Sequence, residues 1–123
     1  MIGGVIIAHK DFGESLLRVI TSIAGKFEHL ASISNDGLST SELVREIKRV
    51  SESMDVDGLF LFVDVFGGSC WQATKMAKLG KAHIVAGISL PMLLSFCHKR
   101  ETVPFDELSG ILETDASRGV RID

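Results

Sequence analysis

The chain has 123 residues and a mass of 13.3 kDa, the size of one ordinary domain, and we expect residues 1–123 to form a single domain. Hydrophobic residues make up 46% of it and charged residues 24%, which excludes disorder over most of its length. The formal net charge is −3 and no long block of like charges occurs, so a nucleic-acid or membrane-surface binder is disfavoured.

The first predicted element is a strand over residues 2–8, because this run is apolar on both faces, as in a buried parallel strand. Apolar residues then recur at helical spacing over residues 12–27, which predicts an amphipathic helix. Residues 30–34 are predicted as a short second strand. A polar loop follows, and Ser39 and Glu42 have the spacing of a capping box, so a second helix is expected to begin there.

The third predicted strand, residues 58–64, is the most apolar and is expected at the centre of the sheet. A turn at residues 67–69 leads from it into a helix. Pro91 and Pro104 each open a later helix, because proline suits the first helical turn. The remaining predicted elements are helices from Ser69 to Lys78, Pro91 to Lys99 and Pro104 to Ser117, a strand over residues 81–87, and a short last strand over Val120–Ile122.

Alternation of strands and helices predicts a doubly wound α/β fold, with helices on both faces of one mostly parallel sheet. We expect the flavodoxin-like strand order 2-1-3-4-5. Right-handed crossovers place the loops after the strands along one edge of the sheet, where ligands bind at the switch point in strand order. His9 follows the first strand and Asp64 ends the third, so both are expected at this edge.

His9 and Asp64 form the first half of a candidate catalytic site. A carboxylate that accepts a hydrogen bond from one imidazole nitrogen leaves the other nitrogen free to act as a nucleophile. Gly67, Gly68 and Ser69 form the second half, because two glycines allow a close backbone approach and a helix N-terminus attracts an anion. The set predicts a phosphoryl acceptor, although each residue taken alone also suits an ordinary loop or cap.

Several absences narrow the class of protein. The chain has no GxxxxGK[ST] loop, no GxGxxG turn and no GxSxG elbow, which argues against direct nucleotide use and against an α/β-hydrolase. Cys70 and Cys97 form no CxxC motif, so we expect two free thiols, no metal and no cofactor. No apolar run approaches the roughly 20 residues of a membrane span, and the N-terminus lacks a basic signal-peptide region, so a cytoplasmic location is expected.

Three stretches of the chain resemble one known family. They are MIGGVIIAHKDFGESLL at the start, GLFLFVDVFGGS in the middle and VAGISLPMLL further on. In this order, and across almost the whole chain, they are similar to the mannose-family EIIA domain of the bacterial phosphoenolpyruvate-dependent sugar phosphotransferase system (PTS). The resemblance implies a phosphotransferase that accepts a phosphoryl group on a histidine from the phosphocarrier HPr and passes it to a histidine on an EIIB partner.

The resemblance also assigns roles to residues. The phosphoryl acceptor corresponds to Nε2 of His9, the carboxylate that holds the other ring nitrogen corresponds to Asp64, and Ser69 corresponds to a hydrogen-bond donor at the site. The family implies a homodimer whose last strand, here Val120–Ile122, is added antiparallel and is sometimes exchanged between subunits. Membrane EIIC and EIID components would be reached only through EIIB.

The chain departs from the family pattern at two places. Lys10 stands where the family commonly has a small residue, and it either pairs with the phosphate or an acidic partner surface, or points to solvent. Cys70, Trp71 and Gln72 follow the Gly-Gly-Ser turn, where the family often has Pro and then Asn two residues on. We expect Trp71 to contact a partner or to cover the pocket. No EIIB-like segment follows, so a stand-alone component is expected.

Our leading hypothesis is a phosphohistidine carrier, from HPr through His9 to a separate EIIB, for mannose-, fructose- or sorbose-type sugar uptake. A regulatory switch would use the same chemistry to report the state of the PTS to a protein target. The phosphotransferase subunit of a dihydroxyacetone kinase fits the histidine strand well but DVFGGS and LPML less well. A receiver domain phosphorylated on Asp64 would need an acidic cluster where the chain has Ala8 and His9. A binding module without chemistry leaves the combination of motifs unexplained.

Overall fold

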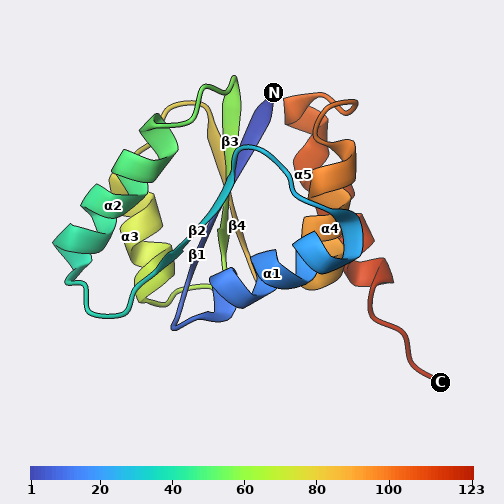
Figure 1. Ribbon diagram of the computed structural model, residues 1–123, viewed down its shortest axis with the longest axis horizontal. Coiled ribbons are helices and arrows are strands. Elements are labelled where there is room, and N and C mark those ends of the chain that lie inside the picture. The colour runs from blue at the N-terminus through green and yellow to red at the C-terminus, as the bar shows by residue number, and fades with distance from the viewer.

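The computed structural model describes residues 1–123. A parallel sheet of four strands forms its middle layer (Figure 1). The order of the strands is β2-β1-β3-β4, and all three pairings are parallel. Ile7 of β1 lies level with Ile33 of β2 and with Val63 of β3, so these three strands end at the same edge. The predicted fold class is confirmed. The strands are β1 Ile2–Ala8, β2 Leu30–Ser34, β3 Gly58–Val63 and β4 Ala82–Ala86.

Helices cover both faces of the sheet, with α2 and α3 on one side and α1, α4 and α5 on the other (Figure 1). Side chains alternate along β1, so that Ile6 packs beneath α4 and α5 whereas Val5 and Ile7 pack beneath α2 and α3. Burial on both faces explains why the central strands are continuous apolar runs. The helices are α1 Phe12–Ala24, α2 Thr40–Glu52, α3 Ser69–Ala77, α4 Leu90–Lys99 and α5 Phe105–Arg118. None of the five has both the length and the apolar character that a membrane span requires.

The helix starts follow the capping signals of the sequence. Ser39 Oγ accepts a hydrogen bond from the Glu42 backbone N–H at 3.2 Å, and Glu42 Oε1 accepts one from the Ser39 N–H at 2.9 Å, which completes the predicted capping box. Pro91 lies in the first turn of α4, as predicted. Helix α1 ends at Ala24, earlier than its apolar pattern suggests, because Gly25 leaves the helix with a φ of 93°.

The predicted last strand is not formed within the single chain. Residues after Arg118 form no strand, and the C-terminus extends away from the body of the molecule (Figure 1). Val120 is 70% exposed and Ile122 is 91% exposed, because no neighbouring strand lies beside them to pair with their backbone. The sheet therefore has the order 2-1-3-4 without a fifth strand, and β4 is an edge.

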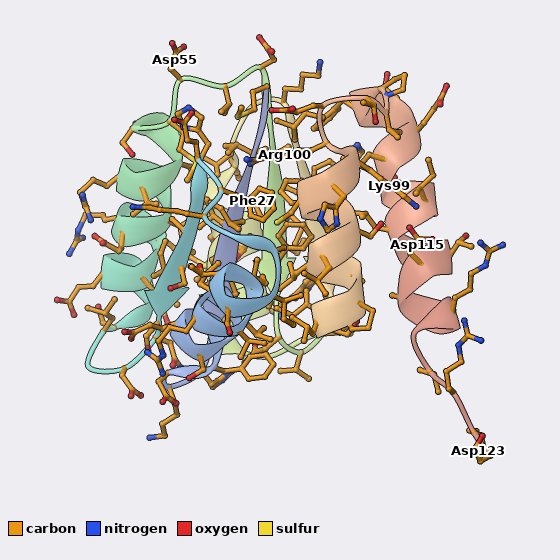
Figure 2. The ribbon with its side chains drawn as sticks, turned by 45° about the vertical axis from the view of Figure 1, so that its right-hand side comes forward. Phe27, Asp55, Lys99, Arg100, Asp115 and Asp123 are labelled. Atoms are coloured by element: carbon orange, nitrogen blue, oxygen red, sulfur yellow. The ribbon has the colours of Figure 1, made fainter.

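A buried arginine links the C-terminal end of α4 to the start of β1 and to the residues just before β2. Arg100 is only 4% exposed, and its guanidinium donates to the carbonyl oxygens of Glu28 at 2.6 Å, Ile2 at 3.3 Å and His29 at 3.4 Å. The guanidinium carbon also lies 5.9 Å from the ring centre of Phe27, the residue labelled beside it in Figure 2. Arg100 thus satisfies three main-chain acceptors with one planar group.

Replacing Arg100 with alanine is expected to lower the free energy of unfolding by about 2–4 kcal/mol, because three main-chain carbonyl groups each lose a donor and the removal of a buried side chain leaves a cavity. Urea unfolding of the wild type and the variant measures the difference. Arg45→Ala is the matched control, since Arg45 is exposed on α2. Equal losses in both variants would show that burial of the guanidinium contributes nothing.

Candidate functional site

The candidate site lies where β1 and β3 end side by side at the carboxyl edge of the sheet. After β1 the chain enters α1 on one face, whereas after β3 it enters α3 on the other face (Figure 1). This divergence is the switch point of the fold, at which ligands of doubly wound proteins bind. His9 follows β1 directly and Asp64 follows β3 directly.

The structure brings His9 and Asp64 into direct contact. Nδ1 of His9 lies 2.7 Å from Oδ2 of Asp64, and the same oxygen accepts the His9 backbone N–H at 2.9 Å. The Val65 N–H donates to the second oxygen, Oδ1, at 2.9 Å. The Asp64 side chain is 14% exposed and that of His9 is 41% exposed. A carboxylate held in this way selects the tautomer of His9 that carries its proton on Nδ1, so Nε2 keeps its lone pair.

Two opposing effects act on the ionisation of Asp64. Burial raises the pKa of this carboxyl, but the hydrogen bonds from the His9 backbone and ring, the charge of His9 and the bond from Val65 outweigh burial and hold the pKa below its usual value of 3.8. Asp64 is therefore ionised at neutral pH. It can stabilise the positive charge that develops on an imidazole whose Nε2 becomes bonded to an electrophile.

The stability of the fold should depend on this ionisation. The pKa of Asp64 is lower in the folded than in the unfolded chain, so its stabilisation is present above the unfolded-state pKa and is lost as the pH falls through the folded-state pKa. Between about pH 5 and pH 2 we expect the unfolding free energy of the wild type to fall more steeply than that of Asp64→Asn, which takes up no proton here. Urea titrations across this range test the difference, and parallel curves would contradict it.

Ser69 and the two glycines complete the site from the β3–α3 loop. Ser69 opens α3, and its Oγ lies 3.4 Å from Nε2 of His9. Gly67 has a φ of 83°, in the left-handed region that favours glycine. A Cβ on Gly68 would lie 3.7 Å from Cε1 of His9, so the backbone passes close to the ring. No side chain caps α3, so the N–H groups of its first turn, which begins at Ser69, have no side-chain acceptor.

Lys10 and Trp71, which depart from the family pattern, both lie near the site. Lys10 has a φ of 56°, and its exposed ammonium lies 3.7 Å from Oδ1 of Asp36, so an acidic neighbour faces it. Such an exposed pair contributes little to stability.

Trp71 is partly buried against the core under α3, and its ring centre lies 4.8 Å from that of Phe66, which is 73% exposed. The side chain of Trp71 therefore supports an exposed phenylalanine next to the site.

Two residues that lie at the site were not among the site residues that the sequence predicted. Asn35, the residue after β2, places Nδ2 3.5 Å from Ser69 Oγ. Cys70 is buried with its Sγ 3.8 Å from Nδ1 of His9. The rule that selected His9 and Asp64, a polar residue directly after a strand, also selects Asn35. The sequence carries no comparable signal for the packing of Cys70 against the ring.

The ligating atoms of His9, Asp64 and Cys70 all lie within 4.8 Å of one another, which is close enough for a shared metal ion. However, Nδ1 of His9 already bonds to Asp64. Burial, and then the nearby charge of Asp64, raise the pKa of the Cys70 thiol to about 11, so a metal would have to displace its proton. These donors are better suited to orienting the imidazole than to holding an ion.

Comparisons with known proteins point to one family. A family model described as the PTS system fructose IIA component matches residues 3–112. No curated protein matches the chain. Among solved structures, the PTS component EIIA of Streptococcus agalactiae superimposes with a TM-score of 0.91 at 23% identity, covering 99% of this chain and 97% of that one.

Two further solved structures share the fold. The mannose/sorbose specific IIA subunit of Enterococcus faecalis gives a TM-score of 0.79 at 22% identity, over 98% of this chain and 93% of that one. The PTS IIA protein associated with the fucose utilization operon of Streptococcus pneumoniae gives 0.82 at 16% identity, over 98% of this chain and 92% of that one. At these identities the likeness concerns the fold.

Proposed function

The chain belongs to the family of PTS system fructose IIA components, and we propose that it is a phosphohistidine carrier, which takes a phosphoryl group from HPr onto Nε2 of His9 and passes it to a separate EIIB. Membership of this family implies phosphotransferase activity in general terms. The observation that carries the specific proposal is the 2.7 Å contact between Nδ1 of His9 and Asp64, which leaves Nε2 as the reactive nitrogen.

The proposed step needs no cofactor. The lone pair of His9 Nε2 forms a bond to phosphorus, while the bond from phosphorus to the donor atom of HPr breaks and its electron pair returns to that atom. The proton on Nδ1 stays in place, and the Asp64 carboxylate balances the charge that the ring gains. Ser69, Gly67 and Gly68 would bind the phosphoryl oxygens through a hydroxyl and open backbone N–H groups. Transfer to EIIB is the same step in reverse.

The surroundings of His9 favour a protein partner over a small molecule. None of the surface cavities of the molecule is lined by His9, Asp64 or Ser69. Next to the site, Val65 is 51% exposed and Phe66 is 73% exposed. A donor protein that reached Nε2 would cover these apolar side chains and exclude water from the transferred group. We place Lys10 at the rim of the same contact, where its ammonium would meet the phosphate or an acidic partner surface.

The labelling of the chain tests this proposal. Mixed with phosphoenolpyruvate, enzyme I and HPr, the purified protein should become phosphorylated, and the label should be labile in acid and stable in base, as expected of a phosphohistidine. Loss of the label on addition of EIIB would establish the carrier. A label that no EIIB accepts would favour the regulatory switch, and a folded protein that takes no label from its cognate HPr would contradict both.

We also propose a cytoplasmic homodimer, in which the strand expected at Val120–Ile122 forms on the partner subunit. Both apolar side chains are exposed in the single chain, and β4 is a free edge of the sheet. Light scattering should give twice the mass of one chain for residues 1–123, and the mass of one chain after removal of the residues beyond Arg118. A dimer that survives this truncation would contradict the strand exchange.

A further inference from the structure

A chain of three polar side chains links the loop after β2 to the reactive nitrogen of His9. Asn35 Nδ2 lies 3.5 Å from Ser69 Oγ, which lies 3.4 Å from His9 Nε2. We propose that Asn35 is a positioning residue for phosphoryl transfer, which turns the Ser69 hydroxyl so that its proton faces Nε2 of His9. The inference rests on the proposed function for its effect on rate, but the hydrogen-bond chain exists independently of any partner.

The direction of each hydrogen bond in this series follows from what each group can donate. His9 donates a hydrogen bond from its Nδ1–H to the Asp64 carboxylate, so its unprotonated Nε2 can only accept. The hydroxyl of Ser69 must then be the donor to Nε2, and its oxygen is left to accept. An amide N–H is a donor only, so the Nδ2 group of Asn35 fits the lone pair of Ser69 and excludes the opposite orientation of the hydroxyl.

The same orientation suits the phosphorylated state. Once Nε2 is bonded to phosphorus it accepts no hydrogen bond, and the proton of Ser69 becomes available to a phosphoryl oxygen. Since Asn35 continues to occupy the lone pair of Ser69, the hydroxyl does not have to reverse during the reaction. A donor that needs no reorientation between the two states lowers the barrier to transfer.

The main chain of Asn35 is fixed separately from its side chain. Its backbone N–H donates to the carbonyl of Ala8, the residue before His9, at 3.2 Å, and its own carbonyl accepts from Leu38 at 3.2 Å. Any residue other than proline would make these bonds, so the amide is not required for the loop. The amide oxygen is buried without a hydrogen-bond partner, which means that the contact with Ser69 is the amide's only bond.

The test compares Asn35→Ala with Asn35→Asp and with the loop control Ser34→Ala, which removes the bond from the Asp36 N–H to Ser34 Oγ without touching Ser69. The first readout is the ¹⁵N chemical shift of His9 Nε2 in the unphosphorylated protein. We expect it to move toward the value of a free imidazole nitrogen in both Asn35 variants and to stay unchanged in Ser34→Ala. Circular dichroism checks that each variant is folded.

The second readout is the rate of phosphoryl transfer from HPr. We expect Asn35→Ala to slow transfer by about threefold to tenfold, the size of one hydrogen bond. Asn35→Asp should be slower still despite its similar shape, because a carboxylate accepts the proton of Ser69 and turns it away from His9. In a Ser69→Ala background the Asn35→Ala change should have no further effect on the rate.

The outcomes separate this inference from the proposed function. An unshifted Nε2 resonance in Asn35→Ala, or independent effects of the Asn35 and Ser69 changes on rate, would overturn the role of Asn35 while leaving His9 as the acceptor. A wild-type protein that takes no phosphoryl group would overturn the proposed function, and with it the effect on rate. The ¹⁵N shift would still decide whether Asn35 orients Ser69.

Discussion

Replacement of His9 by alanine is expected to abolish phosphorylation of the chain by phosphoenolpyruvate, enzyme I and HPr, with no more than a small change in stability. The ring carries the nucleophile of the proposed reaction, and the neighbouring Cys70 thiol cannot replace it, because this thiol is buried and its pKa is raised to about 11. The His9 side chain is 41% exposed, so its removal takes little apolar surface from the core. Phosphate incorporation and thermal unfolding are measured on the same preparation.

The matched control is His98→Ala. His98 is exposed on α4, at the edge of the Phe27 ring, and has no contact with the site. This variant should incorporate as much phosphate as the wild type. If His9→Ala kept its label, the phosphoryl group would have to reside on another residue, and the proposed mechanism would be wrong even though the family assignment would stand.

The sequence was sufficient to predict that His9 and Asp64 lie close together. Both follow apolar runs that are long enough to be buried strands, and the connectivity of a doubly wound sheet makes those strands neighbours. Ser69 was predictable for a similar reason, since a Gly-Gly turn after a strand leads into a helix whose first residue faces the same edge. Local patterns thus identify the residues, and the topology determines their proximity.

Contacts that depend on particular side-chain packing could not be predicted in this way. The distance from Cys70 Sγ to His9 depends on how α3 lies on the sheet, which no spacing in the sequence specifies. The end of α1 was misjudged because Phe27 continues the apolar spacing, although it reaches the core from a loop after Gly25. The strand at Val120–Ile122 has the alternation of a strand, but pairing requires a neighbour that the single chain does not supply.

Asp64 contributes to the proposed mechanism through its negative charge and its two acceptor oxygens, and an asparagine of the same shape has neither in full. It accepts three hydrogen bonds, from the backbone and ring of His9 through Oδ2 and from Val65 through Oδ1. An asparagine has one oxygen and one amino group, so it satisfies only one side of this arrangement. With its oxygen toward His9, the amino group opposes the Val65 N–H. With the amino group toward His9, the ring is driven to carry its proton on Nε2.

We therefore expect Asp64→Asn to slow phosphoryl transfer from HPr by about 100-fold or more, because the variant loses both the tautomer selection and the negative charge that balances the ring. Rapid-quench measurement of the transfer rate, with ¹⁵N resonances of His9 to report its tautomer, separates these two losses. Asp11→Asn is the control, since Asp11 is exposed close to the site and its side chain makes no capping hydrogen bond. If Asp64→Asn transferred at a near-normal rate while its His9 ring changed tautomer, the carboxylate would have no part in the chemistry. If the ring instead kept its proton on Nδ1 and transfer was still slow, the charge of Asp64 would be its essential contribution.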